Sequence, residues 1–289
     1  MQIKDRTFIV SGGSSGLGLA TVVIFLQNGA NVSILDLNPP PSDASLDPSR
    51  ILFTKTNVAS TESLQEALKN TLKWIQGTTK PLSGVICSAG IGLAALALPK
   101  QDPSTTHESV KYMDMSGFDR TLGVNLRGTV DLIRLSLPHM ALNTPWGPDG
   151  ERGIVVIVSS VAAYEGQVGQ LAYSASKGAV RSIVLPLARE LGRKAGIRVM
   201  GIAPGVFLTG LTTQPKKQQP EQGPKKEGGE KPKQSTGARA GINTEMIQYP
   251  MRMGEGHEFA RLVKEIVENP MLNGFVIRLD GAVRMPSRL

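Results

Sequence analysis

A glycine-rich turn near the start of the chain constrains the fold more than any other feature of the sequence. The segment SGGSSGLG, residues 11–18, follows a short β-rich run and opens a stretch with helical apolar periodicity, residues 17–28. Gly12, Gly16 and Gly18 lack a Cβ atom, so backbone N–H groups at the start of this helix can approach a pyrophosphate closely. Because a strand precedes the turn and a helix follows it, the pattern predicts a dinucleotide site. The alternative is a tight turn that binds no ligand.

Strand and helix patterns alternate along the rest of the chain. The predicted strands lie at residues 7–10, 32–35, 51–58, 82–90, 153–160, 197–205 and 274–281. The predicted helices lie at residues 17–28, 61–74, 117–141, 172–191 and 258–269. This alternation is typical of a parallel sheet with helices on both faces. We therefore expect an α/β fold, a single Rossmann-like domain over residues 1–289, with a doubly wound parallel sheet of about seven strands.

The segment after Thr213 breaks this alternation. Residues 214–240 are rich in Lys, Pro, Gly and Gln and contain almost nothing apolar, so they cannot bury enough surface to offset the entropy cost of ordering. Seven Lys or Arg residues oppose three Glu residues in this segment, which therefore carries half of the net charge of +8. We interpret it as a disordered, solvated insertion in a loop, with contact to an anionic ligand as the alternative.

Composition argues against several classes of protein and site. Aromatic residues make up 4% of the chain and none lies among the lysines of the insertion, so stacking on single-stranded nucleic acid has no support. No run of 18 apolar residues predicts a membrane span. The single cysteine, Cys87, rules out an intramolecular disulfide and favours a reducing compartment. His107, His139 and His257 are scattered without metal-ligand spacing, so we expect no metal site.

Two polar residues follow the second and third predicted strands. Asp36 ends the second strand, where a carboxylate can accept hydrogen bonds from both hydroxyls of an adenosine ribose and repel a 2′-phosphate. No Lys or Arg flanks Asp36, so the sequence favours NAD over NADP. Asn57 follows the third strand and can hydrogen-bond an adenine amino group through its side-chain oxygen. Each residue has a plainer interpretation as a turn residue at a strand end.

Residues 156–180 contain a candidate catalytic site for proton transfer. Tyr173 and Lys177 are four residues apart on a predicted helix and therefore share one face. An ammonium group beside a phenol stabilises the phenolate and lowers the tyrosine pKa, as acid–base catalysis near neutral pH requires. Ser160 ends the preceding strand and can hydrogen-bond a substrate oxygen beside Tyr173. The spacing of Tyr173 and Lys177 is common by itself, and the alternative is a solvated helix face.

The second serine and the second tyrosine of this segment have a different interpretation. Ser159 should point to the face opposite Ser160, because strand side chains alternate. Tyr164 has Val168, not a lysine, four residues further on. We therefore expect Ser159 and Tyr164 to be packing neighbours of Ser160, Tyr173 and Lys177.

Several motifs, taken together and in order, resemble one superfamily across nearly the whole chain. They are SGGSSGLG, SAG at 88–90, VNLRG with Asn125, Ser160, YSASK and APG at 203–205, and the superfamily is the short-chain dehydrogenases/reductases. Within it, SSVAAYEGQVGQLAYSASKGAV, LARELGRKAGIRVMGIAPGVF and ENPMLNGFVIRLDGAVRM are similar to the short-chain 3-hydroxyacyl-CoA dehydrogenases. That group, also called type 10 17β-hydroxysteroid dehydrogenase, uses NAD on acyl-CoA and steroid alcohols.

The resemblance implies roles for the matching residues. Ser160 binds substrate and Tyr173 is the acid/base. Lys177 holds the nicotinamide ribose and tunes Tyr173, and Asn125 supports a water proton relay. The resemblance also implies a homotetramer. The residues expected around the dinucleotide are Gly12, Ser15, Gly16, Leu17, Gly18, Asp36, Asn57, Val58, Ser88, Ala89, Gly90, Tyr173, Lys177, Pro204, Phe207 and Thr209.

Some features depart from the family's pattern. Cys87 and Ser88 replace the two asparagines of the usual Asn-Asn-Ala-Gly, and Asn57 replaces the usual Asp after the third strand. Backbone contacts and an adenine contact can survive these changes. The insertion at 214–240 falls where the family has a substrate-covering loop, so it bears on substrate identity. Pro186 should kink the fourth predicted helix, but the family tolerates a proline there, so we expect one helix.

The last three residues, Ser287, Arg288 and Leu289, differ from the S-K-L peroxisomal address only by Arg for Lys. The alternative is a coincidental tripeptide. The first residues go straight into a strand pattern without a signal-peptide or presequence pattern. We therefore expect the peroxisome, with mitochondria or cytoplasm as alternatives.

These expectations combine into the hypothesis of an NAD-dependent oxidoreductase that interconverts a secondary alcohol and a ketone. Tyr173 would deprotonate an alcohol held by Ser160 while hydride leaves the same carbon for nicotinamide. The expected substrate class is (3S)-3-hydroxyacyl-CoA of fatty-acid β-oxidation. One alternative is a dehydrogenase for a steroid or secondary-metabolite ketone. The other is a dinucleotide-binding scaffold that contacts RNA through residues 214–240.

Overall fold

The computed structural model describes residues 1–44, 46–209 and 246–284. Within them, the strands form one seven-stranded parallel sheet in the order β3-β2-β1-β4-β5-β6-β7. The strands are β1 (Thr7–Ser11), β2 (Asn31–Asp36), β3 (Ile51–Lys55), β4 (Leu82–Cys87), β5 (Gly153–Val158), β6 (Ile197–Pro204) and β7 (Val276–Leu279). The predicted doubly wound α/β fold is confirmed.

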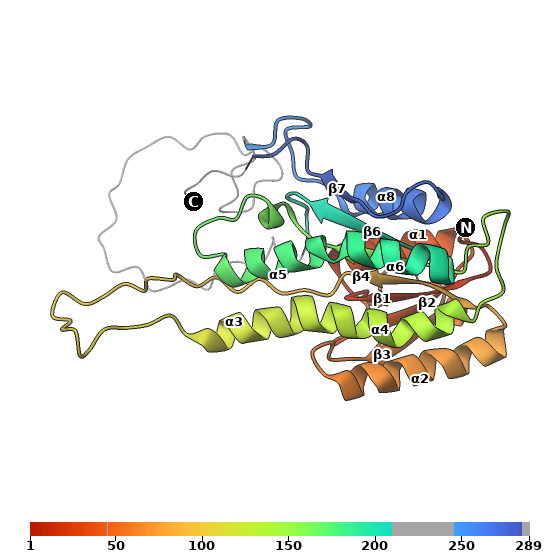
Figure 1. Ribbon diagram of the computed structural model, residues 1–289, viewed down its shortest axis with the longest axis horizontal. Helices are drawn as coiled ribbons and strands as arrows, with labels where there is room; N and C mark the ends of the chain where they lie inside the picture. Colours follow the sequence, from red (N-terminus) through yellow and green to blue (C-terminus); the bar gives the residue numbers. More distant parts are fainter. Residues whose placement is uncertain (45, 210–245, 285–289) are drawn as a thin grey trace.

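Helices cover both faces of this sheet (Figure 1). They are α1 (Gly16–Gln27), α2 (Thr61–Thr78), α3 (Met115–Leu122), α4 (Gly128–Ala141), α5 (Leu171–Ser182), α6 (Val184–Ala195) and α8 (Gly256–Glu268). Short turns are the 3₁₀ helices η1 (Pro48–Arg50) and η3 (Val161–Ala163) and the π turn η2 (Gly123–Arg127). Helices α1 and α8 pack on one face, and α2, α4 and α6 pack on the other.

The side chains of β5 show why the sheet needs two layers of helices. Ile154 and Val156 point into the core that contains Phe259 of α8, whereas Val155 and Ile157 point into the core under α4 and α6. All four are buried, since strand side chains alternate between two covered faces. Burial of one such side chain contributes roughly 1.5–3 kcal/mol, so both helix layers are needed to stabilise the central strands.

The fourth predicted helix is two helices in the structure. The break falls at Ile183, between α5 and α6, and Pro186 stands in the first turn of α6. Pro186 has no N–H to donate to the carbonyl of Ser182, and its ring would clash with that carbonyl in a continuous helix. The expectation of one helix was therefore wrong, although the expected distortion at the proline is present.

Two of the sequence predictions lie on residues outside the described part of the chain. They are the insertion at 214–240 and the tripeptide at 287–289. Among the described residues, no helix is both long enough and apolar enough to cross a membrane. That same part of the chain contains no group of three His, Cys, Asp or Glu side chains that could hold a metal ion.

Candidate active site

A cleft of about 530 Å³ lies at the carboxyl ends of the strands, around the point where the strand order reverses. After β1 the chain builds β2 and β3 on one side of it and then returns to β4 on the other side. The loops after β1 and β4 therefore diverge and leave a crevice between them. All predicted site residues line this cleft except Gly18 and Asn125.

In the glycine turn after β1, backbone segments lie too close together to leave room for side chains. Gly12 has a φ of +68°, and a Cβ atom there would lie 2.9 Å from the backbone of Ala89. Gly16 has a φ of +51°, which also disfavours a side chain. A Cβ atom on Gly18 would lie 2.1 Å from the carbonyl oxygen of Gly12. Gly18 therefore packs α1 against the turn and does not itself line the cleft.

The start of α1 fits the pyrophosphate of a dinucleotide. Ser15 is the N-cap residue, but its side chain makes no capping hydrogen bond, and the first turn contains no acidic residue. The Oγ atom of Ser14 is buried and makes no hydrogen bond. Backbone N–H groups at a helix N-terminus and a buried unpaired hydroxyl both suit an anion with several acceptor oxygens. The residues present therefore fit the cofactor that the glycine pattern predicted.

Asp36 ends β2 and lines the cleft next to the glycine turn. Its Oδ2 atom accepts a hydrogen bond from the N–H of Ser14 at 3.1 Å, and its Oδ1 atom accepts one from the N–H of Asn38 at 3.3 Å. These bonds orient the carboxylate and leave acceptor sites on both oxygens, since a carboxylate has about four. The carboxylate lies where it can accept hydrogen bonds from two ribose hydroxyls.

Asn57 lines the same end of the cleft but has a local structural role. Its side-chain oxygen accepts a hydrogen bond from the N–H of Ala59 at 3.1 Å, which closes an Asx turn. Its own N–H donates to Ser63 Oγ at 3.0 Å at the start of α2. The structure thus bears out the turn-residue interpretation, and contact with adenine remains a prediction.

Ser160 and Tyr173 meet at the other end of the cleft. Ser160 follows β5 and caps η3, and its Oγ atom accepts a hydrogen bond from the N–H of Ala162 at 3.1 Å. Tyr173, from α5, lines the same end of the cleft. Burial raises the pKa of Tyr173, and the Ser160 hydroxyl opposes this increase by favouring the phenolate.

Lys177 lies one helical turn after Tyr173, as the spacing predicted. Its Nζ atom is 5.8 Å from the centroid of the Tyr173 ring and donates a hydrogen bond to the carbonyl oxygen of Val158 at 2.8 Å. Burial lowers the pKa of Lys177 to about 8. The pKa of Tyr173 is raised and not lowered as expected, because burial of the phenol outweighs the opposing effect of Ser160.

Ser159 and Tyr164 are packing neighbours of these residues. Ser159 Oγ donates a hydrogen bond at 2.8 Å to the backbone carbonyl of Lys177, which ties β5 to α5. The Tyr164 ring contacts the guanidinium of Arg181, also on α5, at 4.5 Å from its centroid. Ser159 also lines the cleft, and the choice of Ser160 and Tyr173 over Ser159 and Tyr164 remains a prediction.

Asn125 lies behind the cleft, in the π turn between α3 and α4. Its Oδ1 atom accepts the N–H of Ile91 at 2.8 Å, and its Nδ2 atom donates to the Ile91 carbonyl at 2.9 Å and to Ser176 Oγ at 3.0 Å. A Cβ atom on Gly90 would lie 3.3 Å from both Asn125 Oδ1 and Lys177 Nζ. Asn125 therefore holds the loop after β4 against α5, and its role in a water relay remains a prediction.

Sequence reasoning missed several residues of the cleft. Four of them are immediate neighbours of Asp36, Asn57 or Val58 in the sequence, and that adjacency is the signal that would have found them: Leu35, Leu37, Thr56 and Ala59. Arg120 and Val124 enter from α3 and the π turn, where no motif marks them. The remaining ones lie within predicted strands or directly after the SAG motif: Val158, Ser159, Gly205 and Ile91.

The fold and the cleft together define an oxidoreductase that uses a nicotinamide dinucleotide. The family model described as short chain dehydrogenase matches residues 6–220, and the chain belongs to that family. Its members act on small-molecule alcohols or ketones with this class of cofactor. The membership expected from the sequence motifs is confirmed.

Some relatives within this family are similar to the chain over nearly its full length. The chain is 37% identical to the 3-hydroxyacyl-CoA dehydrogenase type-2 of Homo sapiens over 286 residues, which cover 98% of this chain and 97% of that protein. It is 32% identical to the ipsdienol dehydrogenase of Ips pini, with 98% and 99% covered. The crystal structure of 3-hydroxyacyl-CoA dehydrogenase type-2 from Mycobacterium avium superimposes with a TM-score of 0.76 at 30% identity, covering 98% of this chain and 97% of that one.

Proposed function

We propose that the protein oxidises (3S)-3-hydroxyacyl-CoA to 3-oxoacyl-CoA with NAD, and catalyses the reverse reduction. The observation that carries this proposal is that Ser160, Tyr173 and Lys177, with the lysine one helical turn after the tyrosine, line one end of a cleft whose other end is the glycine turn. The substrate class is supported by full-length similarity to proteins named 3-hydroxyacyl-CoA dehydrogenase type-2.

The side chains at this end of the cleft can transfer a proton between the tyrosine and the alcohol. Ser160 orients the substrate oxygen, and Tyr173 exchanges a proton with it. The nicotinamide, when bound, supplies the hydride acceptor or donor. Because burial raises the pKa of Tyr173, the phenol is protonated at neutral pH and ready to act as the acid in ketone reduction. Alcohol oxidation needs the phenolate, so its rate should rise with pH.

The choice of NAD over NADP rests on Asp36. Its carboxylate lines the cleft at the end of β2 and is oriented by the N–H groups of Ser14 and Asn38. A 2′-phosphate next to this carboxylate would place two anions in contact without a cation between them. Arg120 and Lys177 are the basic residues of the cleft lining within the described part of the chain, and Lys177 lies at the nicotinamide end.

A second candidate substrate class is a secondary alcohol or ketone without CoA. The similarity to ipsdienol dehydrogenase over nearly the full length favours this candidate. It uses the same residues and the same chemistry, and only the groups that recognise the rest of the substrate would differ.

A substrate and cofactor panel tests the proposal. NADH formation at 340 nm would be measured with (3S)-3-hydroxybutyryl-CoA, with its 3R isomer and with cyclohexanol, each with NAD and with NADP. We expect the highest kcat/KM for the 3S acyl-CoA with NAD, and at least about tenfold lower values with NADP because of charge repulsion at Asp36. Equal or higher kcat/KM for cyclohexanol would overturn the acyl-CoA assignment, and a preference for NADP would overturn the cofactor assignment.

A further inference from the structure

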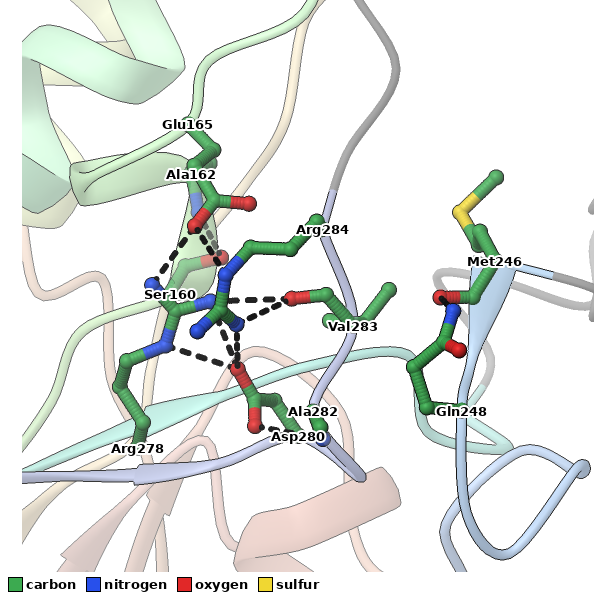
Figure 2. Close-up of polar contacts among 10 residues, drawn as sticks. All are labelled: Ser160, Ala162, Glu165, Met246, Gln248, Arg278, Asp280, Ala282, Val283 and Arg284. Atoms are coloured by element: carbon green, nitrogen blue, oxygen red, sulfur yellow. Dashed lines mark hydrogen bonds and ion pairs between the residues drawn. The ribbon is translucent and has the colours of Figure 1, made fainter.

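The turn that carries Ser160 is tied to the last strand by an ion-pair cluster. We use the name "serine turn" for residues 160–165. Arg278 of β7 donates through Nη1 to Oε1 of Glu165 at 2.8 Å, and through Nε to Oδ2 of Asp280 at 2.8 Å (Figure 2). Its Nη2 atom lies 2.7 Å from the same Asp280 oxygen and also donates to the carbonyl of Val283 at 3.1 Å. One guanidinium thus joins the end of the serine turn to the segment after β7.

Arg284 adds a second cation to this cluster. Its Nη1 atom donates to the carbonyl of Val283 at 2.8 Å, and its guanidinium lies 3.7 Å from Glu165 Oε1 and 3.9 Å from Asp280 Oδ2. Figure 2 shows the two guanidinium groups between the two carboxylates. Two arginines and two carboxylates alternate here, so the charges attract along every close contact.

Tyr164 connects the same turn to the helix that carries Tyr173. Its ring contacts two guanidinium groups, that of Arg181 on α5 at 4.5 Å and that of Arg278 on β7 at 5.1 Å from the ring centroid. A cation near the face of a tyrosine ring is attracted by the ring's electron density. The serine turn is therefore held from two sides, by β7 and by α5.

A small apolar cluster completes the attachment. Val161 of the serine turn, Ile247 and Val283 are all buried against one another. The carbonyl of Gly281 accepts the N–H groups of Gln248 and Tyr249 at 3.1 and 3.2 Å. The serine turn, the segment after β7 and the segment that begins at residue 246 consequently share one packing unit next to the cleft.

We propose that Glu165 and Arg278 are positioning residues for Ser160, which fix the serine turn so that the Ser160 hydroxyl meets the hydroxyl of Tyr173 and the substrate oxygen. Neither residue lines the cleft, so each acts through the turn. The inference rests on the proposed function only for the identity of the substrate. Ser160 and Tyr173 would act in the same way on any secondary alcohol.

The cluster is well placed for such a role. Isolated surface ion pairs contribute little, but here one arginine makes three hydrogen bonds and one further ion-pair contact, and its side chain and that of Glu165 are each only 24% exposed. Glu165 lies five residues after Ser160 and η3 lies between them, so a shift at Glu165 is transmitted through one short 3₁₀ turn. A displacement of the serine by about 1 Å can reduce the rate on the order of 100-fold.

A double-mutant cycle tests the proposal with the full-length enzyme. Glu165→Gln keeps the shape of the side chain and removes its charge. We expect at least about a tenfold lower kcat in the wild-type background, but less than a twofold change in the Ser160→Ala background, where there is no hydroxyl to position. The KM for NAD should stay within twofold, since the cluster is outside the cofactor end of the cleft. Equal losses in both backgrounds would overturn the proposal.

Glu268→Gln is the matched control. Glu268 pairs with Lys264 on α8, and its exposure is similar, so the same change there should leave kcat within twofold in both backgrounds. Arg278→Lys is the second variant, which keeps the charge and loses the forked hydrogen bonds. Its kcat should fall between those of wild type and Glu165→Gln, and a value equal to wild type would contradict the role of Arg278.

The cycle is run with (3S)-3-hydroxybutyryl-CoA and with cyclohexanol. If the wild-type enzyme oxidised cyclohexanol but not the acyl-CoA, the acyl-CoA assignment would be overturned. The double-mutant cycle measured with cyclohexanol would still test the positioning role. Activity on the acyl-CoA with additive effects of Glu165→Gln and Ser160→Ala would overturn the positioning role and leave the proposed function in place.

Discussion

Lys177 is buried beside the cleft, with its ammonium group hydrogen-bonded to the carbonyl of Val158 and 3.3 Å from the place where a Cβ atom of Gly90 would be. Burial of a cation in this environment disfavours the charged form and lowers the lysine pKa to about 8. The group therefore loses its proton within the range in which the enzyme can be assayed. The affinity of a ligand that needs the ammonium form should therefore depend on pH in this range.

Binding of NAD should weaken as the pH rises through about 8. The family resemblance implies that the Lys177 ammonium holds the nicotinamide ribose, so the ligand should prefer the protonated lysine. Affinity should then be constant below pH 8 and fall above it, by up to about tenfold per pH unit. Isothermal titration of NAD between pH 6.5 and 9.5 measures this. The Lys177→Met variant should bind more weakly and without this slope, and an unchanged slope in that variant would contradict the role of Lys177.

The sequence predicts which residues carry the chemistry, but it does not predict their pKa values. The four-residue spacing of Tyr173 and Lys177 and the strand end at Ser160 were enough to place the three side chains together. The direction of the Tyr173 pKa was wrong, because it depends on how deeply the phenol is buried, and burial is set by residues from several elements. The turn interpretation of Asn57 is confirmed by the hydrogen bond that its side-chain oxygen accepts from Ala59, and its contact with adenine remains a prediction.

At the scale of elements, two irregular helices shape the site. The π turn η2 adds a residue to one helical turn and directs Asn125 toward Ile91 and Ser176. The break at Ile183 separates α5, which carries Tyr173 and Lys177, from α6, which packs on β6. Helical periodicity predicts that both segments are helical, but it does not predict a change in hydrogen-bond register within them.

Arg198 joins three elements on the side of the sheet away from the cleft. It stands on β6, is buried, and donates to Glu151 at 2.7 Å. It also donates to the carbonyls at the end of α8 and in the loop that follows, those of Ile266, Val267, Asn269 and Leu272. The carbonyls of Ile266 and Val267 belong to the last turn of α8, where no later helical N–H group reaches them, so the guanidinium caps α8.

Replacement of Arg198 by Met should destabilise the fold by about 3 kcal/mol, because it leaves the buried carboxylate of Glu151 without its guanidinium and several carbonyls without donors. Equilibrium unfolding in urea at fixed protein concentration measures the change. Arg193→Met, at an exposed position on α6, is the control and should change the free energy of unfolding by less than about 0.5 kcal/mol. Equal midpoints for the two variants would contradict the capping role.

At the scale of the whole molecule, the alternation of strands and helices predicts a parallel sheet, and a parallel sheet with one reversal of strand order places its cleft at that reversal. The glycine turn, Asp36 and Ser160 all follow strands, so the sequence order brings them to one edge. Contacts between distant segments are not predicted in this way. Glu165 and Arg278 are 113 residues apart and meet only because β7 is added beside β6.

The central claim is that the cleft transfers a proton through Tyr173 while hydride passes to NAD. Tyr173→Phe should lower kcat for (3S)-3-hydroxybutyryl-CoA on the order of 1,000-fold, because a positioned acid–base group contributes about 10²–10⁴-fold. Binding of NAD, measured by isothermal titration, should stay within about twofold of wild type. Tyr112→Phe, at a tyrosine that is 83% exposed, is the control and should keep full activity. Wild-type turnover in Tyr173→Phe with intact NAD binding would contradict the account.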